Sequence, residues 1–190
     1  SFYNTLITNF SAADRIFDIL DVQPVIKNSL NARPIGKIQG NVEFKNVSFS
    51  YDEENEVLKN VSFKAAKGEK IALVGATGAG KSTIVSLLSR FYDPTKGKIL
   101  VDGKDIKNVD LESLRSQMGI MLQDTFLFSD SIMENIRYGR LDATDQEVIN
   151  AAKAVNAHKF IMELEKGYDT EVNERGSRLS LGQRQLISFA

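Results

Sequence analysis

The chain has 190 residues, with 24 basic and 25 acidic side chains and a formal net charge of −1. This balance argues against a general polyanion-binding protein, which carries a basic surplus, and the absence of cysteine excludes disulfides and thiolate metal sites. The sequence has no apolar run near the ~20 residues that span a bilayer, and no signal peptide. We therefore expect the chain as given to be soluble.

The first predicted element is an amphipathic helix within residues 11–20. Its apolar residues share one helical face: Ala13, Ile16, Phe17 and Leu20. Pro24 predicts the end of this unit, which covers residues 1–23. Residues 24–40 contain Pro34 and Gly36 and are typical of an extended linker.

Two antiparallel strands are predicted next. Apolar side chains recur at about every second position: Val42, Phe44, Val47, Phe49 and Tyr51. The slip between Phe44 and Val47 is typical of a β-bulge. After an acidic turn, the return strand is marked by Leu58, Val61 and Phe63.

The middle of the chain predicts alternating strands and helices. Short apolar runs at residues 71–74 and 119–122 are typical of strands buried on both faces. Between them we expect a helix with apolar residues at 84, 87, 88 and 91, a strand over 99–101 and a helix over 111–118. Later helices are expected over 132–138, 144–155 and 158–164. The fold class is therefore α/β, with an antiparallel β subdomain and a helical subdomain at about residues 124–190.

Residues 75–83 match the phosphate-binding loop, or P-loop, in which glycine and four further residues precede Gly-Lys-Ser/Thr. The stretch consists of Gly75, Ala76, Thr77, Gly78, Ala79, Gly80, Lys81, Ser82 and Thr83. Its glycines let backbone N–H groups point at phosphate oxygens, and the following helix adds its dipole. Lys81 would lie between the β- and γ-phosphates, and Ser82 would ligate Mg²⁺. An ordinary glycine-rich turn is the alternative, which the position between a strand and an amphipathic helix disfavours.

Three further motifs distinguish among P-loop proteins. Residues 179–183 read Leu-Ser-Leu-Gly-Gln and match the LSxGQ signature. Gln123 follows a predicted strand, as the Q-loop glutamine does, and Tyr51 precedes the P-loop, as the A-loop aromatic does. With these motifs in the family's order, residues 41–190 resemble the nucleotide-binding domain of an ABC ATPase, with a P-loop NTPase-type core.

The resemblance implies ATP and Mg²⁺ as ligands and assigns roles to the matched residues. Tyr51 would stack on adenine, although a strand tyrosine that fills a sheet face is the alternative. Gln123 would reach Mg²⁺ and the attacking water, and would act in catalysis with Lys81. The signature residues at a helix N-terminus would bind the γ-phosphate held by a second subunit: Ser180, Gly182 and Gln183.

Flanking segments resemble the exporter branch of the family. Residues 170–176 are similar to the exporter X-loop, with Asn173 in place of the usual glycine, and residues 90–97 to the segment after the P-loop helix. The first helix resembles the cytosolic end of the last membrane helix. The resemblance implies a transporter at the cytoplasmic face of a membrane, with a transmembrane domain in the same chain, a second identical or different nucleotide-binding domain, and no nucleic acid. A soluble ABC ATPase of DNA repair or translation is the alternative.

The family's Walker B aspartate and glutamate and its switch histidine have no match before Ala190. We therefore expect an incomplete core, ATP binding without appreciable turnover, and exposed apolar surface around residues 71–74. His158 has no carboxylate or second histidine at ligand spacing, so we expect it at the surface rather than on a metal.

Overall fold

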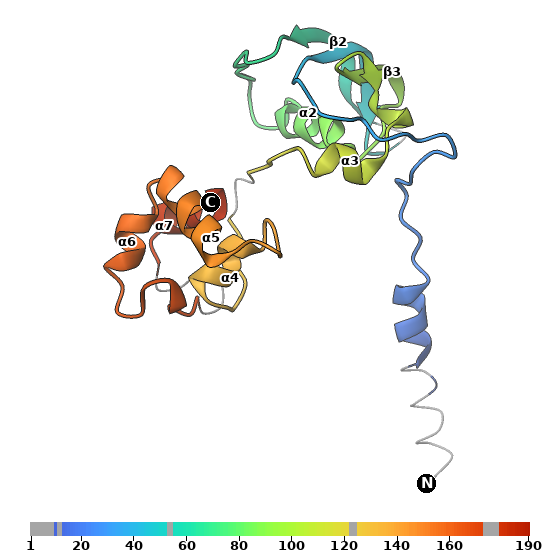
Figure 1. Ribbon diagram of the computed structural model, residues 1–190. Coiled ribbons are helices and arrows are strands. Elements are labelled where there is room, and N and C mark those ends of the chain that lie inside the picture. Colours follow the sequence, from blue (N-terminus) through green and yellow to red (C-terminus); the bar gives the residue numbers. More distant parts are fainter. Residues whose placement is uncertain (1–9, 11–12, 53–54, 122–124, 173–178) are drawn as a thin grey trace. The chain divides into compact units, whose positions relative to one another are not determined.

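The protein is described by a computed structural model that places all residues except 1–9, 11–12, 53–54, 122–124 and 173–178. The chain forms two compact units, Ser1–Met118 and Gly119–Ala190, each with its own hydrophobic core. In Figure 1 the first unit runs from blue to yellow and the second from yellow to red. None of the helices in the described ranges has the length and apolar character needed to cross a bilayer.

The first unit is built on a four-stranded sheet in the order β2-β1-β3-β4, with antiparallel pairing throughout. The strands are β1 (Val42–Ser50), β2 (Glu56–Ala65), β3 (Lys96–Val101) and β4 (Lys104–Asp105). The predicted hairpin is confirmed, because Val47 faces Val61 and Phe44 faces Phe63. The register shifts between Phe44 and Val47, where the bulge was expected.

Gly97 permits the close approach of β3 to this bulge. A Cβ atom on Gly97 would lie 2.3 Å from the Asn46 carbonyl oxygen and 2.4 Å from that of Lys45. Its φ of 79° is also a left-handed conformation that favours glycine. The Asn46 amide donates to the Ser62 hydroxyl at 2.8 Å. The bulge therefore depends on the absence of a Cβ atom at Gly97 and on the hydroxyl of Ser62.

The core of the first unit lies between the sheet and two short helices, α2 (Lys81–Leu88) and α3 (Leu111–Arg115). The most deeply buried large side chains in this cluster include Phe44, Leu87, Ile99, Ile106 and Leu114. Each such side chain contributes about 1.5–3 kcal/mol by leaving water. Helix α3 ends three residues before the predicted boundary, in a turn that precedes Met118.

The stretch expected to be an extended linker is docked along the first unit. Arg33 forms a parallel bridge with Val109, and the Ile35 amide donates to the Ser113 hydroxyl at 3.0 Å. The Gln117 side chain accepts from the Ile38 amide at 3.0 Å and donates to the Gly36 carbonyl at 2.7 Å. These bonds join residues about 80 positions apart, so local patterns do not reveal them.

Arg90 fastens the start of this docked stretch. Its guanidinium, only 2% exposed, donates to the carbonyls of Lys27 and Val109 at 3.2 Å each and to the Asp93 carboxylate at 3.0 Å. Arg90 lies two residues beyond the end of α2, after the C-cap residue Ser89. The end of α2 is therefore tied to the segment that leads from the first helix.

That first helix covers residues 13–20, which confirms the predicted element. Its apolar side chains are exposed: Ile16, Phe17, Ile19 and Leu20. The helix is the blue coil in Figure 1.

Two predicted strands are not found in the described residues. Residues 71–74 and 119–121 have no strand conformation, and residue 122 lies outside the described ranges. A buried strand needs hydrogen-bonded neighbours, and the described sheet offers none to either run. The expected exposure of apolar surface is confirmed, since Val74 is 93% exposed and Ile71 is 44% exposed.

The second unit is a cluster of short helices: α4 (Ile132–Arg137), α5 (Asp145–Ala154), α6 (His158–Met162) and α7 (Leu181–Phe189). Three of them begin at residues whose hydroxyls cap the helix, namely Ser131, Thr144 and Ser180. The predicted helical region is confirmed, with ends that differ by one or two residues. Its core is formed by aliphatic side chains that include Ile132, Ile136, Val148, Ile161 and Ile187.

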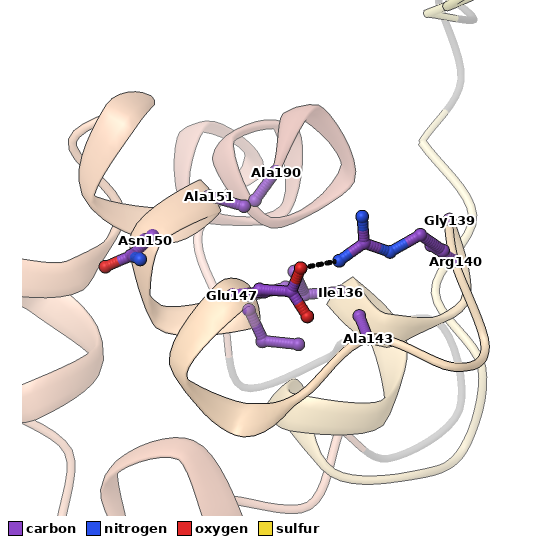
Figure 2. A pocket seen from close by; sticks show the side chains of 9 residues that line it. Ile136, Gly139, Arg140, Ala143, Glu147, Asn150, Ala151 and Ala190 are labelled. Carbon is purple, nitrogen blue, oxygen red and sulfur yellow. Dashed lines mark ion pairs between the residues drawn. The ribbon is translucent and has the colours of Figure 1, made fainter.

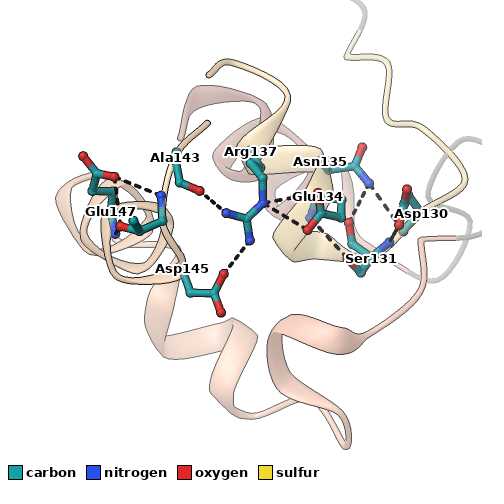
Figure 3. A network of polar contacts seen from close by, with 9 residues as sticks. Asp130, Ser131, Glu134, Asn135, Arg137, Ala143, Asp145 and Glu147 are labelled. Atoms are coloured by element: carbon teal, nitrogen blue, oxygen red, sulfur yellow. Dashed lines mark hydrogen bonds and ion pairs between the residues drawn. The ribbon is translucent and has the colours of Figure 1, made fainter. Parts of the chain in front are cut away.

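Arg137 organises the connection from α4 to α5 (Figure 3). It donates to Asp145 at 2.6 Å and to Glu134 at 3.0 Å, and its guanidinium also contacts the Ala143 carbonyl. The hydrogen bond to Asp145, followed by that to Glu134, raises the pKa of Arg137. Arg137 therefore links α4 to the loop that follows it and to the first residue of α5.

His158 is half-buried rather than at the open surface. Its Nδ1 lies 2.9 Å from the Tyr168 hydroxyl. Burial raises the pKa of Tyr168. The histidine therefore packs within the second unit as a partner of this tyrosine.

Candidate nucleotide-binding site

The predicted P-loop leads directly into α2. Gly78 and Gly80 have φ values of 84° and 80°, which glycine adopts without steric cost. Gly80 is the N-cap of α2, and a Cβ atom on it would lie 2.6 Å from a methyl carbon of Leu58 on β2. The loop thus passes close to the sheet where only glycine fits.

Lys81 folds back over this loop. Its ammonium donates to the carbonyls of Gly75 at 2.9 Å and Ala76 at 2.7 Å. An ammonium has three donors, so these bonds place a positive charge at the loop with donor capacity to spare. No acidic side chain lies in the first turn of α2, so nothing there offsets the positive end of the helix dipole.

Ser82 and Thr83 have different surroundings. Ser82 is exposed at the start of α2, so its hydroxyl is accessible to an ion or ligand beside the loop. Thr83 is only 5% exposed, and its hydroxyl lies 3.1 Å from the hydroxyl of Tyr51. A hard oxygen at Ser82, next to a helix N-terminus, suits Mg²⁺ accompanied by phosphate.

Tyr51 lies in a bend just after β1 and is 54% exposed. Its ring is 4.8 Å from that of Phe49 and 5.1 Å from that of Tyr92, nearly perpendicular to both. The ring therefore does not fill a sheet face, as the alternative interpretation required. The structure brings Tyr51 and the P-loop helix together through the Thr83 hydroxyl.

The signature residues belong to the second unit, at the N-terminus of α7. Ser180 and Gln183 form a capping box: the Ser180 hydroxyl accepts from the Gln183 amide at 3.2 Å, and the Gln183 side chain accepts from the Ser180 amide at 2.9 Å. A Cβ atom on Gly182 would meet nothing within 4 Å. The helix start therefore presents an open surface at Gly182, while the oxygen of the Gln183 side chain is used by the cap.

The remaining predicted residues are placed as follows. Thr77 and Ala79 belong to the exposed P-loop. Gln123 and Asn173 lie outside the described residues. Tyr92 lies within the exporter-like segment 90–97, to which no nucleotide-binding role was assigned, and its aromatic character next to Phe91, just beyond α2, was a visible signal.

The second unit also contains a cavity of about 450 Å³ (Figure 2). It lies between α4 and α5, and Arg140 and Glu147 form an ion pair there. Hydrogen bonds from the Thr144 amide and hydroxyl, and then from Arg140, lower the pKa of Glu147 to about 2. The lining includes Ala190 and none of the predicted nucleotide-binding residues.

The chain is similar to proteins of one known family. The family model described as ABC transporter matches residues 58–190. The uncharacterized ABC transporter ATP-binding protein YknV of Bacillus subtilis is 55% identical over 188 residues, which cover 99% of this chain and 31% of that protein. The putative multidrug export ATP-binding/permease protein YgaD of the same species is 51% identical over 187 residues, which cover 98% of this chain and 32% of that protein.

A solved structure extends the comparison to the fold. The structure of a bacterial Atm1-family ABC exporter with ATP bound has a TM-score of 0.88 and 44% identity, and the match covers 98% of this chain and 33% of that chain. The present chain thus spans about a third of the length of the proteins it resembles. The matched family region contains both the P-loop and the signature helix. The predicted resemblance is confirmed: the chain belongs to the ABC transporter family.

Proposed function

We propose that the chain is the ATP-binding part of an ABC exporter, whose whole protein couples ATP binding and hydrolysis to transport of a substrate across a membrane. The contact between Tyr51 and Thr83 carries this proposal, because it joins an exposed aromatic ring to the helix that follows the P-loop. The names of the relatives support export: one is a putative multidrug export protein and another is an exporter with ATP bound. Neither name supports the alternative of nucleic-acid repair.

ATP would use two parts of the first unit. The adenine would stack on the exposed Tyr51 ring, and the phosphates would accept hydrogen bonds from the P-loop backbone. Lys81 would exchange its bonds with the Gly75 and Ala76 carbonyls for stronger, charge-assisted bonds to phosphate oxygens. Nucleotide binding would therefore break the hydrogen bonds between Lys81 and the carbonyls of the loop.

Mg²⁺ would be held by the exposed Ser82 hydroxyl together with phosphate oxygens and Gln123. The ion would neutralise the charge that develops on the phosphates. Lys81 and Gln123 are the residues we assign to catalysis. For the 190-residue chain we propose that Walker B is missing and that nucleotide binds without appreciable turnover.

The helix start at Ser180 and Gly182 would bind the γ-phosphate of a nucleotide held by a second nucleotide-binding domain, identical or different. The capping box keeps the first turn of α7 ordered, and no acidic residue in that turn opposes an anion. Gln183 would contribute through its remaining amide donors.

The domain boundaries follow from this assignment. Residues 1–23 would extend a membrane helix, residues 24–40 would connect it, and residues 41–190 would form part of the nucleotide-binding domain, with the helical subdomain from about residue 124. The domain would act at the cytoplasmic face of the membrane beside a transmembrane domain of the same chain. The exposed apolar side chains of the helix over 13–20 fit a segment that packs on other helices.

Calorimetric titration of the chain with Mg²⁺-ATP tests the proposal. We expect saturable binding that Lys81→Ala weakens by about 10- to 150-fold, since hydrogen bonds to charged groups contribute about 1.5–3 kcal/mol. Lys59→Ala, which removes an exposed lysine on β2, is the matched control and should leave affinity unchanged. A well-folded chain that binds no ATP would refute the proposal, and steady hydrolysis would refute binding without turnover.

A further inference from the structure

Tyr92 belongs to no nucleotide-binding motif, yet its ring lies beside Tyr51. The ring centroids are 5.1 Å apart and the ring planes meet at 89°. Phe49 completes the cluster, 4.8 Å from Tyr51 and 5.5 Å from Tyr92. Three aromatic rings from two parts of the chain therefore meet next to the P-loop helix.

The backbone on either side of Tyr92 is anchored. Arg90 is buried and bonded to Asp93 at 3.0 Å, and the Phe91 amide donates to the Ser86 carbonyl of α2 at 2.9 Å. The Thr95 amide donates to the Ser48 carbonyl of β1 at 2.9 Å. Tyr92 therefore projects from a short segment that is fixed to both α2 and β1.

Tyr51 has less support from its own segment. It lies in a bend beyond the last residue of β1 and more than half of its surface is exposed. The orientation of its ring therefore depends on its contacts with Thr83, Phe49 and Tyr92. A perpendicular ring pair contributes beyond simple burial because the electron-poor edge of one ring meets the electron-rich face of the other.

We propose that Tyr92 is a positioning residue that holds the Tyr51 ring in the orientation required for stacking on a purine base. This inference rests on the proposed function. Thr83 and Tyr92 lie on α2 and just beyond it, so both set the ring relative to the helix that receives the phosphates. The position of the base relative to the phosphates is thereby fixed through α2 and the segment that follows it.

The right angle between the two tyrosine rings separates their roles. A base stacked parallel to Tyr51 is perpendicular to Tyr92, so both rings cannot stack on the same base. Tyr51 is the ring bonded to the P-loop helix and the more exposed of the two, at 54% against 44%. Tyr92 therefore acts on the nucleotide through Tyr51.

The test compares Mg²⁺-ATP with Mg²⁺-tripolyphosphate, which has the phosphates and no base. In calorimetric titrations of the 190-residue chain, Tyr92→Leu should weaken ATP binding by about 2- to 12-fold, the range for an aromatic pair. Its tripolyphosphate affinity should not change. Tyr92→Phe, which keeps the ring, should restore ATP affinity.

A second comparison distinguishes positioning from direct contact. With Tyr51→Ala already present, Tyr92→Leu should weaken ATP binding no further. A loss that persists without Tyr51 would overturn the inference, because Tyr92 would then contact the base itself. Equal loss of ATP and tripolyphosphate affinity in both Tyr92→Leu and Tyr92→Met would also overturn it, as a general effect on the fold.

The inference and the proposed function fail in different ways. If the unchanged chain binds both ligands and Tyr92→Leu binds ATP equally well, the positioning role alone is refuted. If the folded, unchanged chain binds neither ligand, both are refuted.

Discussion

The hydroxyl of Tyr51 lies 3.1 Å from the hydroxyl of Thr83, so a residue beyond the end of β1 is hydrogen-bonded to the first turn of α2. Thr83 is buried and Tyr51 is more than half exposed. The bond therefore connects an accessible ring to a fixed point of the P-loop helix. Any ligand that stacks on the ring lies at a defined distance from the loop.

This bond should contribute to nucleotide affinity. Tyr51→Phe keeps the ring but removes its hydroxyl, and Thr83→Val removes the other partner while preserving shape. Each should weaken Mg²⁺-ATP binding by about 5-fold, which corresponds to about 1 kcal/mol for a neutral hydrogen bond. In calorimetry the double variant should be no weaker than either single one, and additive losses would show that the hydroxyls act separately.

Gly97 should be far more sensitive to substitution than Gly103, although both have positive φ values of 79° and 78°. Gly97→Ala adds a methyl group 2.3 Å from the Asn46 carbonyl oxygen, whereas a Cβ atom on Gly103 meets nothing within 4 Å. We expect Gly103→Ala to lower the free energy of unfolding by about 1–2 kcal/mol, from the left-handed backbone alone. Gly97→Ala should cost about 3–5 kcal/mol. Urea denaturation measures both, and equal losses would contradict the close approach at the bulge.

Arg90→Lys should destabilise the first unit although it keeps the charge. A lysine lacks the planar fork that reaches Asp93 and the carbonyls of Lys27 and Val109. The loss should be about 2–4 kcal/mol, since buried acceptors are left without partners. Hydrogen exchange should accelerate at the amides of Arg33 and Ile35, whose hydrogen-bond partners lie within residues 108–113.

Arg33→Lys is the matched control for this prediction, because Arg33 has an exposed side chain in the same docked stretch. It should change stability by less than about 0.5 kcal/mol. Equal effects of the two substitutions would show that Arg90 does not fasten the segment.

The carboxyl of Glu147 should titrate at about pH 2. Hydrogen bonds from Thr144, first from its amide and then from its hydroxyl, and from Arg140 favour the ionised form. Because this pKa is lowered from 4.5 in the folded state, the stabilisation is complete above about pH 4.5 and is lost as the pH falls toward 2.

Carbon-detected NMR titration of the Glu147 carboxyl measures this midpoint. Thr144→Val removes the hydroxyl donor and should move the midpoint upward. The difference in unfolding free energy between the unchanged chain and Glu147→Gln should shrink as the pH falls through the same range. A midpoint near 4.5 in the unchanged chain would contradict the capping geometry.

Local sequence patterns predicted the elements that are specified by residues close together in the sequence. The alternation over residues 42–63 located the hairpin and its bulge, and the P-loop pattern located the start of α2. The serine at position 180 marked the start of α7. These features depend on neighbours within a few residues, which a sequence displays.

The features that were predicted wrongly or not at all involve residues whose partners are distant in the sequence. Residues 71–74 and 119–121 have the composition of buried strands, but a strand forms only beside another with free hydrogen-bonding groups. The contact of Tyr92 with Tyr51 and the docking of residues 27–38 also join distant positions. Such pairings depend on the assembled fold, and neither periodicity nor motif spacing specifies them.

The docking of residues 27–38 limits where the chain tolerates changes in length. Arg33, Ile35 and Ile38 bond to successive points along residues 108–117. One residue inserted among them would therefore shift every later residue of the segment away from its hydrogen-bonding partner. Residues 21–26 precede these bonds, and an insertion there leaves them intact. Fusions and spacers that alter the distance between the first helix and the sheet therefore belong before Lys27.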